Sequence, residues 1–341
     1  MSRNREAPLI MVCCWMAAVW VMLTLSSCAG IDPQVDEALS LPYHDAYQDN
    51  PPVQWWYWNG HLQGTQGQGF GFQLVFFSIH PNLLMTHVAI TDLDRGEFHY
   101  DTRTRFAIPE KVKDGFDLTG SGGTHTWARG GDGRDHLHAE FEGYVLDLQL
   151  AENRPPILHY NGLAHHYGFG GYTYYYSRPD MQARGSLSVA GEAIDVSGSV
   201  WFDRQFGDLE EIIDSGWQWF SLQLDDGSRV VLFDFGEARL REENLLVRID
   251  PQNRVEVIPS EAYRLTAHDH WQSPVSGCDY PMGWTLESAE FRYDITPYLT
   301  DQEVRPKPGA WLAPTYWEGA ARVEGKQPGN AYVELHGFCS E

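Results

Sequence analysis

The sequence predicts an all-β protein that contains two tandem antiparallel β-barrel domains. Short runs rich in aromatic and β-branched residues recur along the 341 residues, and Gly, Pro, Asn and Asp separate them. Residues 69–79, 197–206 and 229–235 have the length of strands, and no long segment with a 3.6-residue period follows the first 28 residues. Asp225-Asp226-Gly227 between two such runs predicts a β-hairpin.

An N-terminal export signal precedes this body. Arg3 and Arg5 stand before an apolar run over residues 9–25, and Leu25-Ser26-Ser27-Cys28 resembles the lipobox of bacterial lipoproteins. In such proteins the signal peptide, here residues 1–27, is removed and the cysteine, here Cys28, carries the lipid. An ordinary secretory signal or an N-terminal transmembrane anchor is the alternative interpretation.

The segment after Cys28 indicates the expected location. Ala29 follows the cysteine, and a residue other than Asp there favours sorting to the bacterial outer membrane, on the periplasmic side. Residues 28–50 contain few large apolar side chains and are expected to be a tether. Because no other apolar run is long enough to cross a membrane, we expect a soluble body held by its lipid alone.

We expect the two barrels at residues 51–180 and 181–341. Trp55-Trp56-Tyr57-Trp58 is followed by Phe72-Gln73-Leu74, and Trp201-Phe202-Asp203-Arg204 is followed at a similar offset by Trp217-Gln218-Trp219. A duplicated barrel leaves such an echo, although chance among many aromatic residues also produces one. The boundary is placed near Arg178-Pro179-Asp180, which interrupts the strand pattern.

Composition argues against one class of partner, and the cysteines raise the question of a disulfide. The chain has 24 Lys and Arg against 47 Asp and Glu, a formal charge of -23, which argues against a nucleic-acid partner. After removal of the signal, Cys278 and Cys339 are the remaining thiols besides Cys28. An oxidising compartment makes a disulfide between them plausible, and two free thiols are the alternative.

Alternation sorts the aromatic residues, because side chains i and i+2 of a strand share a face. The 13 Trp therefore divide between core and any ligand pocket. The rows expected to share a face are Gln54, Trp56 and Trp58; Trp55, Tyr57, Asn59 and His61; Trp201, Asp203 and Gln205; Val200, Phe202, Arg204 and Phe206; Tyr172, Tyr174 and Tyr176; and Trp217 and Trp219, with Gln218 and Phe220 opposite them.

Asp203 beside Trp201 is the main catalytic candidate. A carboxyl group desolvated among aromatic rings has a raised pKa, so it could hold a proton near neutral pH and donate it. A structural ion pair or a turn cap is the alternative role. His61, Asn59 and Glu318 are further candidates, although polar residues near strand ends often only bond to a loop, and Glu318 could belong to a buried ion pair.

Paired histidines raise the question of a metal site. The pairs are His165-His166, His136-x-His138 and His268-x-His270. Two histidines on one strand can ligate one ion, but no third ligand follows from the spacing. We therefore expect no metal and, in the absence of a dinucleotide or phosphate-binding motif, no cofactor.

Several blocks together resemble one family. Residues 54–62, Gln54-Trp55-Trp56-Tyr57-Trp58-Asn59-Gly60-His61-Leu62, resemble the signature E-W-W-Y-x-x-G-x-L, and residues 198–207, with Trp201-Phe202-Asp203-Arg204, resemble G-x-a-W-m-D-R-x-x-G. Residues 216–220, 280–284, 316–319 and 329–335 supply further blocks in order. The chain is thereby similar to the AttH-like group, related to CrtC-type carotenoid 1,2-hydratases and often labelled secreted hydrolases.

The resemblance implies a tandem pair of lipocalin-like barrels and relatives that act on hydrophobic polyenes or terpenoid-like molecules. The hydratases add water across an isolated C=C bond without a redox cofactor, and AttH-type members often accompany ABC-transporter components. Three departures matter. Gln54 replaces the Glu of the first signature, Trp201 stands where the hydratases carry Tyr, and their His-x-Trp pair falls at Tyr174 and Tyr176. These differences argue against a true carotenoid hydratase.

Two functions of different classes follow. The first is a cofactor-free hydratase or isomerase acting on a hydrophobic, terpenoid- or lipid-like molecule, with Asp203 as the acid. Aromatic rings of Trp201, Tyr174, Tyr176 and Trp219 would stabilise a cation, and His61 or Asn59 would orient water. Ligand contacts are expected from Trp55, Tyr57, Trp217, Trp219, Trp317 and Glu318. The second is a non-catalytic lipid-binding lipoprotein that serves an ABC transporter.

Overall fold

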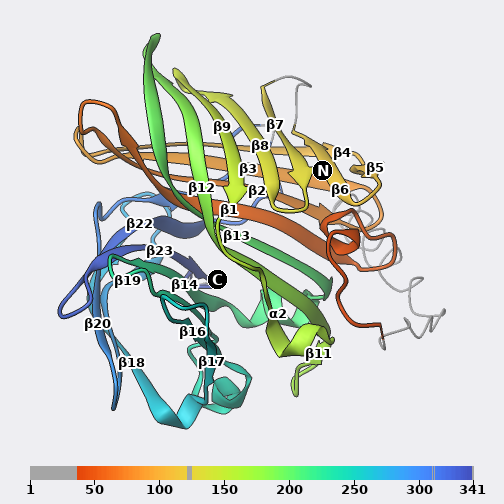
Figure 1. Cartoon of the computed structure of the whole chain (residues 1–341), viewed down its shortest axis with the longest axis vertical. Coiled ribbons are helices and arrows are strands. Elements are labelled where there is room, and N and C mark those ends of the chain that lie inside the picture. Colours follow the sequence, from red (N-terminus) through yellow and green to blue (C-terminus); the bar gives the residue numbers. More distant parts are fainter. Residues whose placement is uncertain (1–36, 121–124, 309, 311, 340–341) are drawn as a thin grey trace, which may run out of the picture. The chain divides into compact units, whose positions relative to one another are not determined.

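The computed structural model describes residues 37–120, 125–308, 310 and 312–339 (Figure 1). The predicted signal peptide, residues 1–27, and the predicted lipid attachment site Cys28 lie outside the described residues. All features below belong to the unit of residues 38–341. Within the described ranges, no helix is both long and apolar enough to span a membrane.

The first half of the described chain forms one antiparallel sheet of 13 strands. Its order is β4-β3-β2-β1-β13-β12-β9-β8-β7-β6-β5, and β10 and β11 pair with β12. The strands are β1 (Val53–Gly64), β2 (Gly69–Ile79), β3 (Leu83–Asp92), β4 (Glu97–Phe106), β5 (Glu110–Val112), β6 (Gly115–Thr119), β7 (Thr126–Gly131), β8 (Arg134–Phe141), β9 (Tyr144–Glu152), β10 (Ile157–Leu158), β11 (His165–His166), β12 (Tyr172–Val189) and β13 (Glu192–Asp208).

The second half forms an antiparallel sheet of ten described strands in the order β17-β16-β15-β14-β23-β22-β20-β19-β18, with β21 paired to β22. The strands are β14 (Trp217–Leu224), β15 (Arg229–Asp234), β16 (Leu245–Ile249), β17 (Val255–Ile258), β18 (Tyr263–Gln272), β19 (Asp279–Ser288), β20 (Arg292–Pro297), β21 (Glu303–Val304), β22 (Tyr316–Glu324) and β23 (Gly329–His336). The described helices are η1 (Tyr43–Asp45), η2 (His159–Gly162), α2 (Glu210–Ser215), η3 (Ala238–Glu243) and η4 (Ser260–Ala262).

The predicted strands and hairpin are present. Residues 69–79 form β2, residues 197–206 lie within β13, and β14 and β15 pair across the Asp225-Asp226-Gly227 turn. Gly227 has a φ of +89°, which a residue with a Cβ adopts only under strain, so the glycine suits this turn. The all-β, lipocalin-like fold predicted from the sequence is therefore confirmed.

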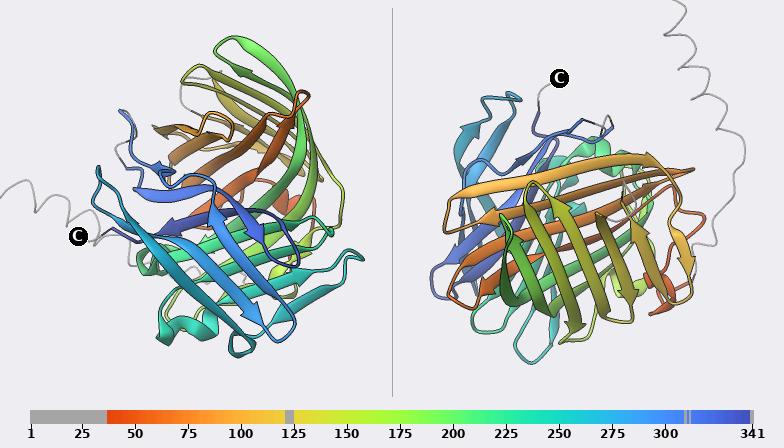
Figure 2. Two further views of the ribbon diagram at one scale, coloured as in Figure 1. Left: turned by 90° about the vertical axis from the view of Figure 1, so that its left-hand side faces the viewer. Right: turned by 90° about the horizontal axis from the view of Figure 1, so that it is seen from above.

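Separate apolar cores on the two sides of the first sheet explain why both faces of its central strands are hydrophobic. Each sheet curls around its own interior (Figure 2). Trp56, Trp58 and Phe202 lie in the core of the first sheet, whereas Trp55 and Trp201 lie in a core shared by both sheets. A third core fills the second sheet. The predicted alternation along β1 and β13 is confirmed, and its two rows face two different cores.

The passage between the sheets differs from the predicted domain boundary. The boundary expected after residue 180 falls inside β12, and the chain leaves the first sheet after Asp208 and enters the second at Trp217. The internal sequence repeat, taken above as a sign of duplication, also has another explanation. Its two parts, Trp55-Trp56-Tyr57-Trp58 and Trp201-Phe202-Asp203-Arg204, lie on β1 and β13, which pair with each other within one sheet.

The segment expected to be a tether packs against the first sheet over its described part. Asp45 is 1% exposed, and its carboxylate accepts hydrogen bonds from Arg178 Nη2 at 3.0 and 3.1 Å and from the Tyr176 hydroxyl. The Asp45 carbonyl accepts a hydrogen bond from Trp56 Nε1 at 2.9 Å. Residues 38–50 therefore belong to the folded body, because a buried arginine and a tyrosine need this carboxylate.

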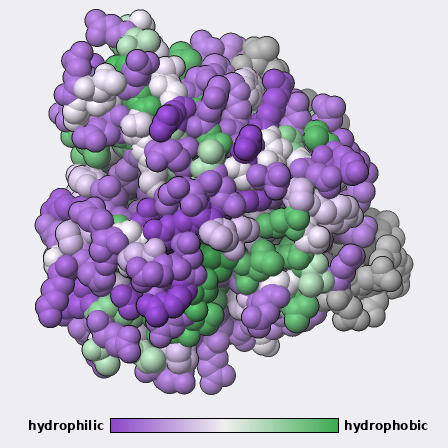
Figure 3. Space-filling view, in the orientation of Figure 1, coloured by the Kyte–Doolittle hydropathy of each residue, from purple (hydrophilic) through white to green (hydrophobic). Residues whose placement is uncertain are grey.

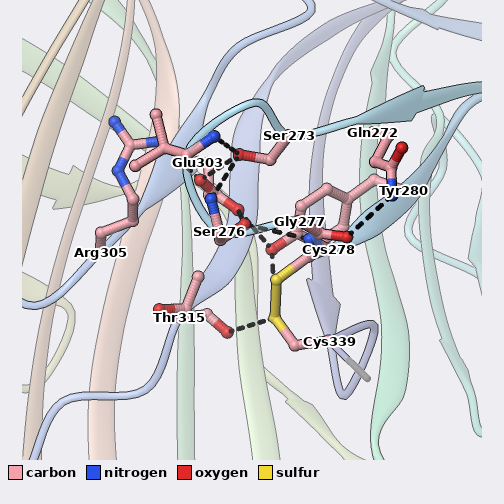
Figure 4. Close-up of a disulfide and its surroundings, with 11 residues drawn as sticks. Gln272, Ser273, Ser276, Gly277, Cys278, Tyr280, Glu303, Arg305, Thr315 and Cys339 are labelled. Carbon is pink, nitrogen blue, oxygen red and sulfur yellow. Dashed lines mark hydrogen bonds and ion pairs between the residues drawn. A yellow bond between two sulfur atoms is a disulfide. The ribbon is translucent and has the colours of Figure 1, made fainter. Parts of the chain in front are cut away.

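Cys278 and Cys339 form a disulfide that ties the start of β19 to the segment after β23 (Figure 4). Of the two alternatives that the sequence left open, a disulfide and two free thiols, the structure has the disulfide. Beside it, the fully buried Glu303 accepts hydrogen bonds from Ser273 at 2.8 Å and Tyr280 at 3.0 Å and pairs with Arg305 at 2.5 Å (Figure 4). The Ser276 hydroxyl also donates to Glu303, and together these donors hold the pKa of Glu303 below its usual value despite burial.

Candidate active site

A small cavity lined by aromatic rings and carboxyl groups lies between the two sheets. Its volume is about 30 Å³, enough for one or two water molecules. The first sheet contributes strands β1, β2 and β13 to its wall, and the second sheet contributes β14, β15, β22 and β23. The lining residues are Trp55, Tyr57, Val75, Phe77, Asp203, Gln205, Trp217, Trp219, Phe233, Glu318 and Glu334.

Asp203 is held by three hydrogen-bond donors. Its Oδ1 accepts from Ser177 Oγ at 2.5 Å and from Trp201 Nε1 at 2.6 Å. Its Oδ2 accepts from the Tyr175 hydroxyl at 2.5 Å, and Trp219 Nε1 in turn donates to that hydroxyl at 3.2 Å. The carboxyl group is 3% exposed, so these donors replace the water that an exposed carboxylate would bind.

Burial and hydrogen bonding act on Asp203 in opposite directions. Burial raises the pKa of the Asp203 carboxyl, and the donors from Ser177, Tyr175 and Trp201 lower it, which leaves a pKa of about 6. At pH 7 most of the group is therefore ionised. The raised pKa that the sequence predicted for Asp203 is therefore confirmed, but the predicted role as a proton donor fits less well, because a pKa of about 6 and three donors suit a carboxylate that accepts a proton.

A pair of carboxyl groups faces Asp203 from the other sheet. Glu318 and Glu334 are register partners on β22 and β23, and the Tyr57 hydroxyl donates to Glu318. Burial and the adjacent Glu334 raise the pKa of Glu318 well above its usual value. Burial also raises the pKa of Glu334 to about 7, and the charge of Asp203 adds to the shift. The pair therefore holds at least one proton at neutral pH.

The structure brings together most of the predicted ligand-contacting residues. Trp55, Tyr57, Trp217, Trp219 and Glu318 line the cavity as expected. Trp201 lies beside it and donates to Asp203. Trp317 instead lies in the core of the second sheet, and its Nε1 donates to the Thr300 carbonyl at 2.8 Å. Since it alternates with Glu318 along β22, it faces away from the cavity.

Tyr174 and Tyr176 do not lie with Asp203. Both belong to the core of the first sheet, and the Tyr176 hydroxyl donates to Asp45. The register of β12 with β13 sets Ser177 opposite Asp203 and Tyr175 opposite Gln205, so the odd-numbered residues share the face of Asp203. The sequence selected the even-numbered row because it held three tyrosines, which is the wrong face.

Asn59 and His61 lie on the face between the sheets but do not line the carboxyl cavity. Asn59 Oδ1 accepts a hydrogen bond from Ser221 Oγ at 2.9 Å. His61 lines a separate, open cavity of about 510 Å³, with its ring centre 6.0 Å from that of Tyr298. Burial lowers the pKa of His61 to about 4, so it is neutral at pH 7. Within the described part of the chain, neither residue forms a hydrogen bond with Asp203.

The sequence missed several residues of the site, of which Tyr175, Ser177 and Glu334 matter most for its chemistry. Tyr175 and Ser177 were overlooked because a serine and the middle tyrosine of a run carry no individual signal. Glu334 was quoted only as part of a block, although it alternates with Tyr332 and His336 along its strand. Glu334 could have been found by the signal that identified Asp203, namely a carboxyl group that shares one face of a strand with aromatic or imidazole rings.

The histidine pairs bind carboxylates. His136 Nε2 and His138 Nδ1 contact the two oxygens of Asp147 at 2.9 and 3.1 Å. His165 contacts Glu243 at 3.2 Å, and His268 and His270 contact neighbouring aspartates. Within the part of the chain that the structure describes, no group of three or more His, Cys, Asp or Glu side chains is arranged to hold a metal ion.

The outer surface contrasts with the cavity. Figure 3 shows that the face seen in Figure 1 is mostly hydrophilic, as the acidic composition indicates, and that hydrophobic surface gathers near its centre. Fold and site together define a lipocalin-like all-β protein with a buried carboxyl site between its two sheets.

The family follows from comparison with known proteins. The model of the AttH-like family matches residues 32–338, so the chain belongs to this family, as the sequence blocks indicated. Among solved structures, a protein from Nitrosomonas europaea described as an AttH candidate is 26% identical. It has a TM-score of 0.74, over 89% of this chain and 98% of that one.

A second solved structure shares the fold. Kievitone hydratase from Nectria haematococca is 19% identical, with a TM-score of 0.72 over 89% of this chain and 94% of that chain. No curated protein sequence matches this chain. These likenesses support the two-sheet, lipocalin-like fold.

Proposed function

We propose that the protein is a cofactor-independent enzyme of the hydratase or isomerase type that acts on a hydrophobic, terpenoid- or lipid-like substrate. The observation that carries this proposal is the set of carboxyl groups in one aromatic cavity. Asp203 is the best proton acceptor among them, because three donors stabilise its charge. Glu318 and Glu334 are the proton reservoir, because burial raises the pKa of each, with the charge of Glu334 adding to the shift of Glu318 and the charge of Asp203 adding to that of Glu334.

The proposed reaction uses these groups in opposite roles. A protonated carboxyl of the Glu318–Glu334 pair donates its proton to one carbon of a C=C bond, which leaves a cation on the neighbouring carbon. Water adds to that carbon and loses a proton to Asp203, so the product is an alcohol. In an isomerase, Asp203 instead removes a proton from the adjacent carbon and a shifted double bond forms. Both routes balance without an oxidant or reductant, and return of the proton from Asp203 to the Glu318–Glu334 pair restores the enzyme.

Aromatic rings supply the rest of the site. The faces of Trp55 and Trp219 line the cavity and attract a developing cation through their π electrons. The volume of about 30 Å³ accommodates water but no terpenoid, so substrate entry requires side chains to move. Phe77 is only partly buried, and we expect it to move first.

Comparison supports the reaction class without identifying the substrate. One solved protein with this fold is named as a hydratase, at 19% identity. The fold is therefore compatible with addition of water to a double bond. Because one fold can host many functions, the proposal rests on the carboxyl groups of this chain rather than on the shared fold.

The test is turnover in H₂¹⁸O with a panel of terpenoid alkenes and unsaturated fatty acids, read by mass spectrometry. The wild-type protein should form an ¹⁸O-labelled alcohol or a double-bond isomer. Asp203→Asn and Glu318→Gln should each lower the rate by about 10²-fold or more. Asp135→Asn is the matched control, because Asp135 is a buried carboxyl with a pKa raised to about 7 that bonds Trp58 outside the cavity. Undiminished turnover in Asp203→Asn contradicts the mechanism.

A carrier of hydrophobic molecules is the competing outcome. Such a protein needs the aromatic rings but no acid, and it should retain an unaltered lipid through gentle purification, which native mass spectrometry detects. A bound lipid that exchanges freely, with no product from any substrate, favours the carrier that serves an ABC transporter. An empty protein that converts substrate favours the enzyme.

We also propose that the protein is attached through lipid on Cys28 to the periplasmic side of a bacterial membrane, most simply the outer one. The supporting observation is the lipobox-like Leu25-Ser26-Ser27-Cys28 after an apolar run. Cys28→Ser should abolish labelling by a palmitate analogue and shift the protein from the membrane to the released fraction. Unchanged labelling contradicts the anchor.

A further inference from the structure

Gln205 lines the carboxyl cavity but has no role in the reaction steps proposed for Asp203, Glu318 and Glu334. Its side chain is 1% exposed, and its Nε2 is buried without a hydrogen-bond partner among the described residues. An unpaired buried donor is costly, so a native protein keeps one where it serves a purpose. An amide N–H donates and carries no charge, so its natural partner is an acceptor oxygen.

Gln205 stands beside Asp203 on one face of β13. Residues i and i+2 of a strand share a face and lie about 6.6 Å apart. The pairing of the strands sets Gln205 opposite Trp55 of β1 and opposite Tyr175 of β12. Trp55 also lines the cavity, and Tyr175 donates to Asp203. The amide is therefore placed where a single oxygen atom can bond both Gln205 and the Asp203 carboxylate.

Asp203 can accept one more hydrogen bond, and it does so at Oδ2. Its Oδ1 already accepts from Ser177 and Trp201, and Ser177 Oγ in turn lies 2.8 Å from His159 Nε2 behind it. Its Oδ2 accepts from the Tyr175 hydroxyl at 2.5 Å. Each oxygen of a carboxylate has two lone pairs, so Oδ2 can bond a second donor.

The cavity between these groups suits a water molecule. Its volume of about 30 Å³ exceeds the roughly 10–15 Å³ that one water needs. A buried water also needs two to four polar partners. Gln205 Nε2 supplies a donor, Asp203 Oδ2 supplies an acceptor, and the carboxyl group of Glu334 lines the same cavity.

We propose that Gln205 and Asp203 hold the water that adds to the double bond, and that Gln205 thereby makes the protein a hydratase rather than an isomerase. The amide donates to one lone pair of the water oxygen, and one O–H of the water donates to Asp203 Oδ2. The other lone pair forms the C–O bond with the cation. The O–H bond to Asp203 then breaks, its electron pair stays on the oxygen, and the proton passes to the carboxylate.

The position of this water decides between two fates of the same cation. A carboxylate that takes a proton from water can also take one from the carbon next to the cation, which gives the isomerised alkene. A water held by Gln205 puts an oxygen atom between Asp203 and the substrate, so addition is faster than loss of a carbon-bound proton. The inference rests on the proposed function, since it takes a cation to form in this cavity.

The experiment measures the ratio of two products in H₂¹⁸O, with the same panel of terpenoid alkenes and unsaturated fatty acids. Gln205→Met keeps the length of the side chain and removes both amide hydrogens. The ratio of ¹⁸O-labelled alcohol to isomerised alkene should fall about tenfold, the effect of one lost hydrogen bond. A general loss of folded protein lowers both products equally and leaves the ratio unchanged. Gln205→Leu should give the same shift, which keeps the test valid if one variant does not fold.

Gln223→Met is the matched control. Gln223 of β14 is half-buried, and its Nε2 is also buried without a partner among the described residues. It lines the separate cavity that contains His61 rather than the carboxyl cavity. The control should keep the wild-type ratio. An unchanged ratio in the Gln205 variants, or an equal shift in Gln223→Met, overturns the inference.

A crystal structure of the substrate-free chain separates this inference from the proposed function. The wild-type protein should hold an ordered water within about 3.2 Å of both Gln205 Nε2 and Asp203 Oδ2, and Gln205→Met should lack it. A wild-type structure without that water overturns the inference, even if substrate is converted. If the water is present and no alkene of the panel is converted, the proposed function fails and the water site at Gln205 stands.

Discussion

Glu318 on β22 and Glu334 on β23 stand directly opposite each other in the sheet, with Tyr57 of the other sheet donating to Glu318. Like charges at such positions repel, so the pair retains a proton that isolated glutamates would lose at neutral pH. This relationship, across from a carboxylate at Asp203, is what turns an aromatic core into a candidate acid–base site.

Replacing one member of the pair should change how stability depends on pH. Because the pKa of Glu334 is raised from 4.5 to about 7, its contribution to stability is present below 4.5 and is lost as the pH rises to about 7. Glu334→Gln removes that loss. Relative to wild type, its free energy of unfolding should rise through this window by up to about 1.4 kcal/mol per pH unit.

Urea denaturation at several pH values between those limits measures the difference. Glu256→Gln, a change at an exposed position of β17, should leave the pH dependence as it is in wild type. A difference between Glu334→Gln and wild type that stays constant with pH contradicts the prediction.

Tyr175→Phe should raise the pKa of Asp203 above about 6, because it removes a hydroxyl that donates at 2.5 Å. A hydrogen bond to a charged group contributes about 1.5–3 kcal/mol, which corresponds to a rise of about one unit or more. Infrared titration of the carboxyl band measures it. Tyr176→Phe is the control, since its hydroxyl donates to Asp45 on the other face. An equal pKa shift in both variants contradicts the hydrogen bond from Tyr175 to Asp203.

Asp45→Ala should destabilise the protein by about 3–5 kcal/mol, because it leaves the buried guanidinium of Arg178 without one of its two carboxylate partners. Thermal and urea unfolding measure the loss. Tyr43→Ala, two residues earlier and 55% exposed, should change stability by about 0.5 kcal/mol or less. Equal, small effects at both positions mean that residues 38–50 do not support the fold.

Reduction of the Cys278–Cys339 disulfide should lower stability by about 2–4 kcal/mol, since the bond closes a loop with a sequence separation of 61. Unfolding with and without a reductant measures the change. The variant carrying both Cys278→Ser and Cys339→Ser should match the reduced wild type and should not respond to the reductant. If the reductant also lowers the stability of that variant, the loss does not come from this disulfide.

Local patterns sufficed for much of the fold. The Asp-Asp-Gly turn, the β2 and β13 strands and the two-faced rows of β1 follow from neighbours in the chain, because a hairpin and a period of two are local properties. The pairing of Asp203 with Trp201 follows for the same reason, since two residues on one strand share a face.

The sequence did not predict which residues of different strands contact each other. The sequence placed Tyr174 and Tyr176 in the site, whereas Tyr175 lies there and bonds Asp203, because in a strand one position reverses the face. The boundary between the sheets was placed inside β12, because a strand that runs through Arg178-Pro179-Asp180 has a register shift there rather than an end. The segment around Asp45 looked like a tether because its partner, Arg178, is distant in sequence.

The sequence alone therefore determined the class of fold, the family, the faces of individual strands and the central carboxyl group. Only the tertiary structure decided which faces meet. It brings Asp203 of the first sheet against Glu318 and Glu334 of the second, and His159 behind Ser177. The physical reason is that period-two alternation orients a side chain within its own strand, whereas strand register and the curl of each sheet set its partners on distant strands.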